Sequence, residues 1–459
     1  MRSHPARRLC RALLAPVVAA GLLLGGAVPA QAATPQPSDT QQSWAADGTA
    51  AALPTRDASQ VREIGPGRLD PSFGGFVVTD TDIPEFSLSR QHLAAPLPPH
   101  LAERNDLMVF GSGWQAEFLG GMTAFSLEVA GDEVRVIAPN GAAHRYEHTG
   151  GNCYRAADGS ELTRDADEII ERTGSKQLTF VWRMVAGQWR VTAVGTPDAG
   201  MDRVTYDALG RVKRLTRGDA SGAYADISYA TATTAMATNL GSSRGMIDSI
   251  ASAAHRNAVP TTVATYLYDS AGRLAVVANP NAGQQSSYAY DDQSRLTKVD
   301  SLLRGSWTMR YESNGEVVAT KGDSDVSPAQ LCSARNYMWG ANTCWADPVR
   351  HYGWRSPSWK VTPTGKSIVG IYYDHCTTAP DQPDGFDFRP ACDMHDYGYG
   401  LIATGYAKYA EKESVDDLFY ITLKDHTCPA YSAWSRWACE ADAWIYRQGV
   451  RAGDPNNGK

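Results

Sequence analysis

A short tandem repeat between residues 206 and 317 constrains the fold of this chain more than any other feature. The segments YDALGRV at Tyr206, YDSAGRL at Tyr268, YDDQSRL at Tyr290 and YESNGEV at Tyr311 share one pattern, with spacings of 62, 22 and 21 residues. A unit of about 21 residues accounts for all of them, because the first spacing is close to three units. In the first two copies Asp is followed three residues later by Gly, which suits a type I turn between two strands. Each unit is therefore predicted to be a β-hairpin.

Changes in composition and in hydrophobic periodicity divide the chain into four parts. Residues 1–32 predict a secretory signal peptide, because arginines precede an apolar run and Ala-Gln-Ala at 30–32 supplies a cleavage site. Residues 33–105 lack a sustained period and indicate a linker or loosely ordered extension. Residues 106–330 carry short β-type runs between turn residues, and residues 331–459 carry cysteines, aromatics and helical periodicity. The predicted fold class is multidomain, with an all-β repeat region followed by an all-α, disulfide-bonded domain.

Charge and hydropathy limit the functional classes. The 459 residues carry a formal net charge of -7 and show no Lys/Arg run, which argues against a nucleic-acid-binding protein. No stretch after the predicted signal peptide approaches the roughly 18 apolar residues that a spanning helix requires. We therefore expect a secreted, extracellular protein without a transmembrane segment.

The cysteines fit export. Cys10 leaves with the predicted signal peptide, and six of the remaining seven cysteines lie in the last third of the chain. Outside the cell this clustering indicates a disulfide framework, for which six cysteines allow 15 connectivities. Local pairing is the simplest arrangement and gives Cys332–Cys344, Cys376–Cys392 and Cys428–Cys439, with Cys153 left over.

The stretch CTTAPDQPDGFDFRPACDMHDYGYG, at residues 376–400, carries a His-Asp pair on a predicted helix. Pro390 suits the first turn of a helix that runs towards Gly405. A second amphipathic helix is predicted around residues 415–423 and a third over residues 433–450. On the first helix one face holds Cys392, His395, Asp396 and Tyr399.

This stretch also predicts a metal site. A cystine between Cys376 and Cys392 would bring Asp374 and the backbone at His375 close to Asp396. Two carboxylates with loop carbonyls are the oxygen ligands that a hard cation such as Ca²⁺ selects. Zinc is the alternative, with His375, Cys376, Cys392 and His395 as ligands, but export argues against free thiolates.

The same residues resemble the signature of the secreted prokaryotic and fungal phospholipase A2 family. The matching pieces are DHC at 374–376, APDQPDGFDF at 379–388 and ACDMHDYGY at 391–399. The resemblance covers roughly the last quarter of the chain, from about Trp354 onward.

The resemblance implies a set of roles for individual residues. It makes His395 the general base, and it makes the side chains of Asp374 and Asp396 and the carbonyl of His375 ligands of Ca²⁺. An aspartate on the next helix orients the base; the family spacing of 21 residues selects Asp416, with Asp417 as the competitor. The implied reaction is hydrolysis of the sn-2 ester of a glycerophospholipid at a membrane or micelle surface, which gives a lysophospholipid and a fatty acid.

The repeats resemble the YD repeats of Rhs-type proteins, and we expect the β region to deliver or display the lipase. A cell-surface glycan and an immunity protein are the further partners that this organisation suggests. The rival interpretation is a non-catalytic surface- or carbohydrate-binding protein in which the lipase-like domain is structural. Retention of Asp374, His395, Asp396 and Asp416 together favours the enzyme, because unpaired buried polar groups are costly to keep without a use.

Overall fold

The computed structural model describes residues 61–456 apart from 96–98, 174–177, 197–198, 282, 302–303, 323–331, 341–343, 345–356 and 373. These residues belong to one compact unit, Pro54–Lys459. The predicted signal peptide at 1–32 and the first part of the predicted extension, 33–60, lie outside the described residues.

A five-stranded antiparallel sheet begins where a loosely ordered extension was expected. Its strands follow one another in the order β1 (Arg62–Ile64), β2 (Gly67–Asp70), β3 (Gly75–Ile83), β4 (Leu88–Leu93) and β5 (Trp114–Glu117). Short helical turns connect them: η1 (Pro71–Phe73), η2 (Pro84–Phe86), α1 (Pro99–Ala102) and, after β5, η3 (Phe118–Ala124). Strands of this sheet between Arg62 and Leu93 thus replace part of the linker expected over residues 33–105.

Buried charges explain why this sheet was missed. All of β4 is buried, including Arg90, whose guanidinium lies 2.9 Å from the carboxylate of Asp82 and donates to the hydroxyl of Tyr288 at 2.8 Å. Polar side chains therefore occupy core positions and hide the alternation of apolar residues that marks a strand.

A larger antiparallel sheet runs from β6 to β23 and closes on itself, with each strand paired to the next in sequence. This confirms the all-β character of the central region. Its strands are β6 (Ser126–Ala130), β7 (Glu133–Ile137), β8 (Ala143–Gly150), β9 (Cys153–Arg155), β10 (Glu161–Arg164), β11 (Glu168–Thr173), β12 (Leu178–Val185), β13 (Gln188–Thr196), β14 (Gly200–Tyr206), β15 (Val212–Thr216), β16 (Tyr224–Tyr229), β17 (Ile247–Ala253), β18 (Thr261–Tyr268), β19 (Leu274–Asn279), β20 (Gln284–Tyr290), β21 (Leu296–Ser301), β22 (Gly305–Tyr311) and β23 (Val317–Lys321).

The YD segments lie at hairpin turns of this sheet. In the first copy the N–H of Gly210 donates to the carbonyl of Asp207 at 3.0 Å, and Gly210 has a φ of 79°, which a glycine tolerates without strain. The carboxylate of Asp207 accepts the backbone N–H of Arg211 at 2.9 Å, and the guanidinium of Arg211 lies 3.9 Å from the ring centre of Tyr229. The same stacking recurs for Arg273 on Tyr290 and Arg295 on Tyr311. Cation–π contacts therefore join successive units.

The C-terminal domain is built mainly from helices, as expected, but it is not purely α because β24 (Ser358–Val361) and β25 (Ser367–Gly370) form a hairpin against α5. Its disulfides join Cys332 to Cys344, Cys376 to Cys392 and Cys428 to Cys439, the pairs favoured by local spacing. Cys153, interpreted above as left over, is not a free thiol. The helices are α3 (Ala334–Met338), η5 (Pro383–Gly385), α5 (Arg389–Ala403), η6 (Tyr409–Glu411), α6 (Lys412–His426), η7 (Cys428–Ala430) and α7 (Ala433–Arg451).

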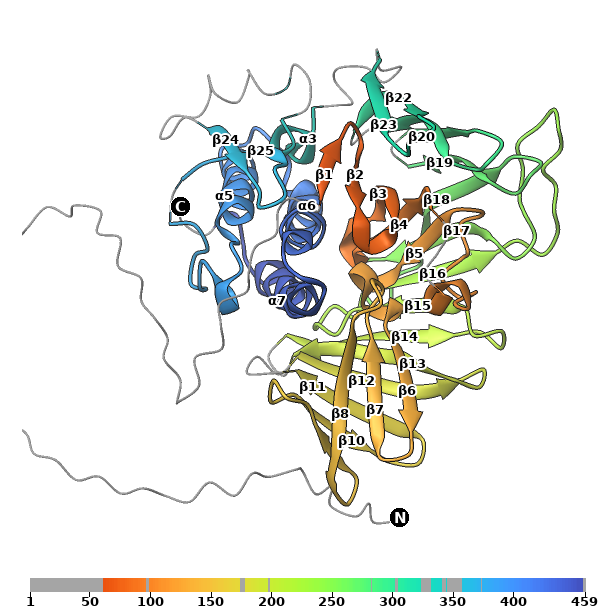
Figure 1. Cartoon of the computed structure of the whole chain (residues 1–459). Coiled ribbons are helices and arrows are strands. Elements are labelled where there is room, and N and C mark those ends of the chain that lie inside the picture. The colour runs from red at the N-terminus through yellow and green to blue at the C-terminus, as the bar shows by residue number, and fades with distance from the viewer. Residues whose placement is uncertain are drawn as a thin grey trace, which may run out of the picture. The chain divides into compact units, whose positions relative to one another are not determined.

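Helices α6 and α7 pack against the five-stranded sheet (Figure 1). The hydroxyl of Tyr420 donates to the carbonyl of Gly120 at 2.9 Å, and a Cβ on Gly120 would lie 2.2 Å from the tyrosine ring. The guanidinium of Arg436 reaches the carboxylate of Asp70 at 3.1 Å across the same boundary. The helical domain and the β region therefore share one hydrophobic core, which contains residues of both.

Candidate active site

Helices α5 and α6 bring the predicted base and its partner together. Pro390 lies in the first turn of α5, as its sequence context predicts. On the face of α5 that meets α6, a Cβ on Gly398 would lie 2.6 Å from both Met338 and Val415. Only a glycine permits this close approach, which sets the distance between the two helices. His395 on α5 and Asp416 on α6 consequently face each other.

The carboxylate of Asp416 is the centre of a buried hydrogen-bond network. Its Oδ1 lies 2.9 Å from Nε2 of His395 and accepts the hydroxyl of Tyr399 at 2.9 Å, while its Oδ2 accepts Nζ of Lys412 at 2.6 Å. Burial raises the pKa of Asp416, but the hydrogen bond and charge of His395, followed by the charges of Arg447 and Lys412, outweigh it and hold that pKa below the ordinary value. Asp416 is thus kept as an anion that faces the imidazole.

Asp417 points in another direction. Its carboxylate lies 3.2 Å from the guanidinium of Arg335, and burial raises its pKa despite that cation. The sequence left open which of the two aspartates lies next to the base. In the structure Asp416 lies beside His395, whereas Asp417 is packed between α6 and the rest of the molecule.

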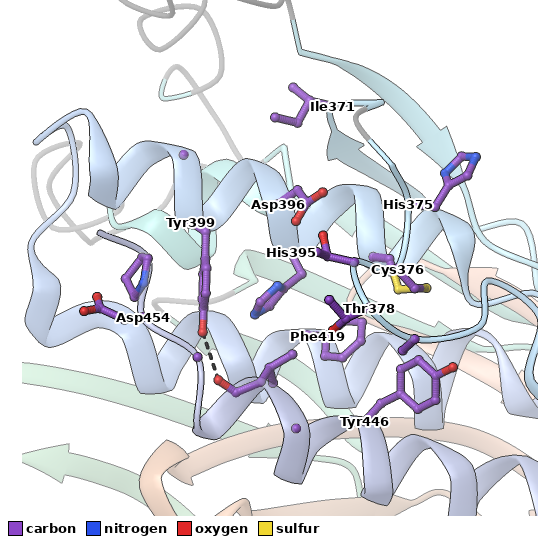
Figure 2. Close-up of a pocket in the computed structure, with 18 of the residues that line it drawn as sticks. Ile371, His375, Cys376, Thr378, His395, Asp396, Tyr399, Phe419, Tyr446 and Asp454 are labelled. Carbon is purple, nitrogen blue, oxygen red and sulfur yellow. Dashed lines mark hydrogen bonds between the residues drawn. A yellow bond between two sulfur atoms is a disulfide. The ribbon is translucent and has the colours of Figure 1, made fainter. Parts of the chain in front are cut away.

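A cavity of about 630 Å³ opens beside His395. Figure 2 shows the imidazole of His395 with Asp396, Tyr399 and Phe419 around this space. Apolar groups form most of the wall, and all the lining residues belong to the C-terminal domain. The lining includes Ile371, Cys376, Ala379, Pro380, Ala403, Phe419, Ile445, Tyr446, Gly449 and Val450.

The loop at residues 374–376 carries the remaining predicted site residues. His375 has a φ of 57° and therefore adopts a left-handed conformation that is unusual for a residue with a side chain. Nδ1 of His375 lies 2.7 Å from the carboxylate of Asp393, so its ring is engaged by α5. The disulfide between Cys376 and Cys392 fastens this loop to the first turns of α5. Asp374 is exposed, and its Oδ1 accepts the hydroxyl of Thr377 at 2.9 Å.

The donor chemistry of this loop and of α5 fits a hard cation. His375 and Asp396 both line the cavity, whereas Asp374 does not. Within the described ranges, no group of three or more His, Cys, Asp and Glu side chains is gathered in the way a metal cluster requires. The zinc alternative fails because Cys376 and Cys392 are joined in a disulfide and supply no thiolate. What remains is a set of oxygen donors: the carboxylates of Asp374 and Asp396 and the carbonyls of the loop.

Tyr399, Lys412 and Phe419 belong to the site but had no assigned role in the sequence analysis. The ring centres of His395 and Phe419 are 5.0 Å apart, so Phe419 packs against the imidazole. A signal for Lys412 was present, because it precedes Asp416 by four residues and so lies on the same face of α6. No described helix is long and apolar enough to cross a membrane.

Two known protein families have models that match parts of this chain. Residues 365–453 match the family model described as prokaryotic phospholipase A2, and residues 263–301 match the RHS repeat model. The chain therefore joins a phospholipase A2-type domain at its C-terminus to an RHS repeat region.

Among curated proteins, a secretory phospholipase A2 of Arthroderma benhamiae is 37% identical over 83 residues, which cover 17% of this chain and 55% of that protein. The chain thus spans about half the length of the curated relative that it matches. Solved structures of TcdB2-TccC3-Cdc42 and of the Tc holotoxin pore of Photorhabdus luminescens each match 55% of this chain and 14% of theirs. Both are 14% identical, with TM-scores of 0.24 and 0.23. Scores this low support no statement about shared architecture.

Proposed function

We propose that this protein is a secreted, calcium-dependent phospholipase A2 that hydrolyses the sn-2 ester of glycerophospholipids. The observation that carries the proposal is that His395 lines a largely apolar cavity and lies 2.9 Å from the buried carboxylate of Asp416. An imidazole held by a buried carboxylate is suited to general-base catalysis near neutral pH.

The two nitrogens of His395 would have different tasks. Nε2 faces Asp416, so the carboxylate favours the tautomer that carries its proton on Nε2. Among the described residues no hydrogen bond to Nδ1 is found, which leaves this nitrogen to take a proton from water as the water attacks the ester. No protein nucleophile is needed, and the reaction proceeds without a covalent intermediate.

Calcium would be held by the carboxylates of Asp374 and Asp396 and by the carbonyl of His375. When bound, Ca²⁺ supplies a positive charge for the lipid phosphate and for the developing oxyanion. The left-handed backbone of His375, together with the engagement of its ring by Asp393, supports a role for its carbonyl rather than for its imidazole. The apolar wall near Phe419 and Ile445 suits the acyl chains of the lipid.

Fatty-acid release from phosphatidylcholine vesicles by the chain 33–459 tests this function. With Ca²⁺ we expect release of the sn-2 acid, which a chelator abolishes and which His395→Gln lowers by about 100-fold or more, the usual contribution of a general base. His255→Ala, an exposed histidine of the β region, is the control and should keep full activity. A well-folded chain that releases no fatty acid with Ca²⁺ would overturn the proposal in favour of a binding protein.

Neighbouring aspartates on α6 provide a matched pair of variants. Asp416→Asn removes the charge beside His395 and should abolish most of the activity; it also leaves Lys412 without its carboxylate partner, so the melting temperature should fall as well. Asp417→Asn removes the partner of Arg335 and should lower the melting temperature with less effect on kcat. Equal loss of kcat in the two variants would contradict the assignment of Asp416.

A binding measurement tests calcium separately from activity. Calorimetric titration of the chain with Ca²⁺ should show one site, which Asp374→Asn and Asp396→Asn weaken. Unchanged affinity in both variants would remove these carboxylates from the proposed ligand set.

A further inference from the structure

Lys412 occupies an unusual place for a lysine. It is the first residue of α6, its side chain is only 8% exposed, and its Nζ donates to Oδ2 of Asp416 at 2.6 Å. The same nitrogen donates to the carbonyls of Val450 at 3.1 Å and Arg451 at 3.2 Å, at the end of α7. All three protons of the ammonium group therefore have acceptors.

The stability of α6 itself does not explain this position, although the ammonium group does satisfy carbonyls of the last turn of α7. The N-terminus of a helix carries a positive partial charge, so a cation in the first turn is unfavourable there. Burial of the ammonium group adds a desolvation cost. A residue that breaks a local rule in this way marks a functional constraint more often than a structural one.

We propose that Lys412 is a positioning residue for the base, holding the carboxylate of Asp416 in the orientation in which it meets His395. This role presupposes that His395 is the base, as proposed above. With Oδ2 taken by Lys412, the imidazole of His395 and the hydroxyl of Tyr399 meet at Oδ1. The charge of Lys412 also contributes to the lowered pKa of Asp416.

Lys412 also ties this pair to the cavity wall. The carbonyl of Val450 accepts both Nζ of Lys412 and the hydroxyl of Tyr399, the latter at 3.0 Å, as Figure 2 shows for Tyr399. Val450 lines the cavity, and its carbonyl is one of the last-turn groups of α7 that have no partner within the helix. Through this network a single ammonium group fixes the distance between the catalytic pair and the part of α7 that faces the substrate.

Kinetics of three variants test the proposal in the full chain. The substrate is monomeric dihexanoylphosphatidylcholine, with Ca²⁺ present. Lys412→Met should lower kcat by about 10–100-fold, the range for outer-shell partners of functional groups, with KM unchanged. Lys412→Arg keeps the charge and the donors and should recover most of the rate. Lys424→Met is the matched control, because Lys424 is a buried cation on the same helix whose partners, Glu117 and Asp425, lie away from the cavity.

A spectroscopic measurement separates this proposal from the proposed function. Proton NMR of the chain with isotope-labelled histidine, assigned by loss of the signal in His395→Gln, should show a low-field imidazole N–H that is hydrogen-bonded to Asp416. Lys412→Met should broaden or remove this signal, and Lys424→Met should keep it. If Lys412→Met does not fold, Lys412→Gln, which keeps one donor without the charge, takes its place with the same expected loss.

Two results would overturn the proposal. One is a Lys412→Met or Lys412→Gln protein that is folded and keeps both its kcat and its low-field signal. The other is a Lys424→Met protein whose kcat falls as much as that of Lys412→Met, because the loss would then follow from removing any buried cation of α6 and not from the contact with Asp416. If the native chain releases no fatty acid, the proposed function fails, while the low-field signal still decides whether Lys412 orients the pair.

Discussion

Arg436→Met would remove a cation from the boundary between α7 and the five-stranded sheet. Arg436 reaches Asp70 at 3.1 Å and Glu440 at 2.8 Å, and the side chains of Arg436 and Asp70 are 3% and 0% exposed. Loss of one partner from such a pair leaves an uncompensated buried charge and costs about 3–5 kcal/mol. Because Arg68 stays 3.4 Å from Asp70, we expect the lower end of that range, about 3 kcal/mol. That is a large part of the roughly 5–15 kcal/mol that keeps a domain folded.

Urea denaturation measures this loss. Far-UV circular dichroism reports on the helices, and tryptophan fluorescence reports on both the helical domain and the β region. We expect the urea midpoints measured by the two methods to fall together, because Arg436 and Asp70 belong to different regions that share one core. Arg310→Met is the control, since Arg310 and Glu312 are 75% and 42% exposed and such a pair contributes about 0–1 kcal/mol. A loss as small as that of the control, or a helical transition that moves alone, would refute the idea that the two regions fold as one unit.

Two further predictions concern the same boundary. Burial lowers the pKa of His426, although Glu63, whose carboxylate lies 2.6 Å from the imidazole, opposes this shift. Neutral His426 therefore stabilises the folded chain above the unfolded pKa of about 6.5. This contribution is lost as the pH falls through the lowered pKa of the folded state. The free energy of unfolding should therefore fall as the pH drops below about 6.5, and less steeply in His426→Gln; equal slopes in urea titrations below this pH would contradict the assignment. A fragment of residues 334–459 should show no cooperative thermal transition by circular dichroism, because the β-region partners of Tyr420, Lys424 and Arg436 are missing from it. A fragment that melts cooperatively and keeps its activity would contradict this expectation.

The candidate site was largely predictable from the sequence because its spacing is local. His395 and Asp396 are adjacent, and Pro390 marks the start of their helix, so short-range rules place them correctly. Asp416 and Asp417 could not be separated in this way, since adjacent residues on a helix point about 100° apart and only the packing of α5 against α6 decides which one meets His395.

The N-terminal sheet was not predictable by the same rules. Asp80 in its core pairs with Arg90 on the neighbouring strand and with Arg304, which lies far away in the sequence, between β21 and β22. Hydrophobic alternation is a local signal, and it disappears when long-range ion pairs take core positions. No sequence pattern indicated the core that this sheet shares with α7, because the sequence predicted that the two belong to separate domains.

Helix α6 serves two surfaces at once. Asp416 holds His395 at the cavity and Phe419 lines the cavity, while Tyr420 and Lys424 contact residues at the end of the five-stranded sheet. An insertion or deletion of one residue within α6 would rotate everything beyond it by about 100° and would move residues of both surfaces out of place. We therefore expect homologous chains with this organisation to vary in the length of the loops around α6 and to keep the length of the helix itself.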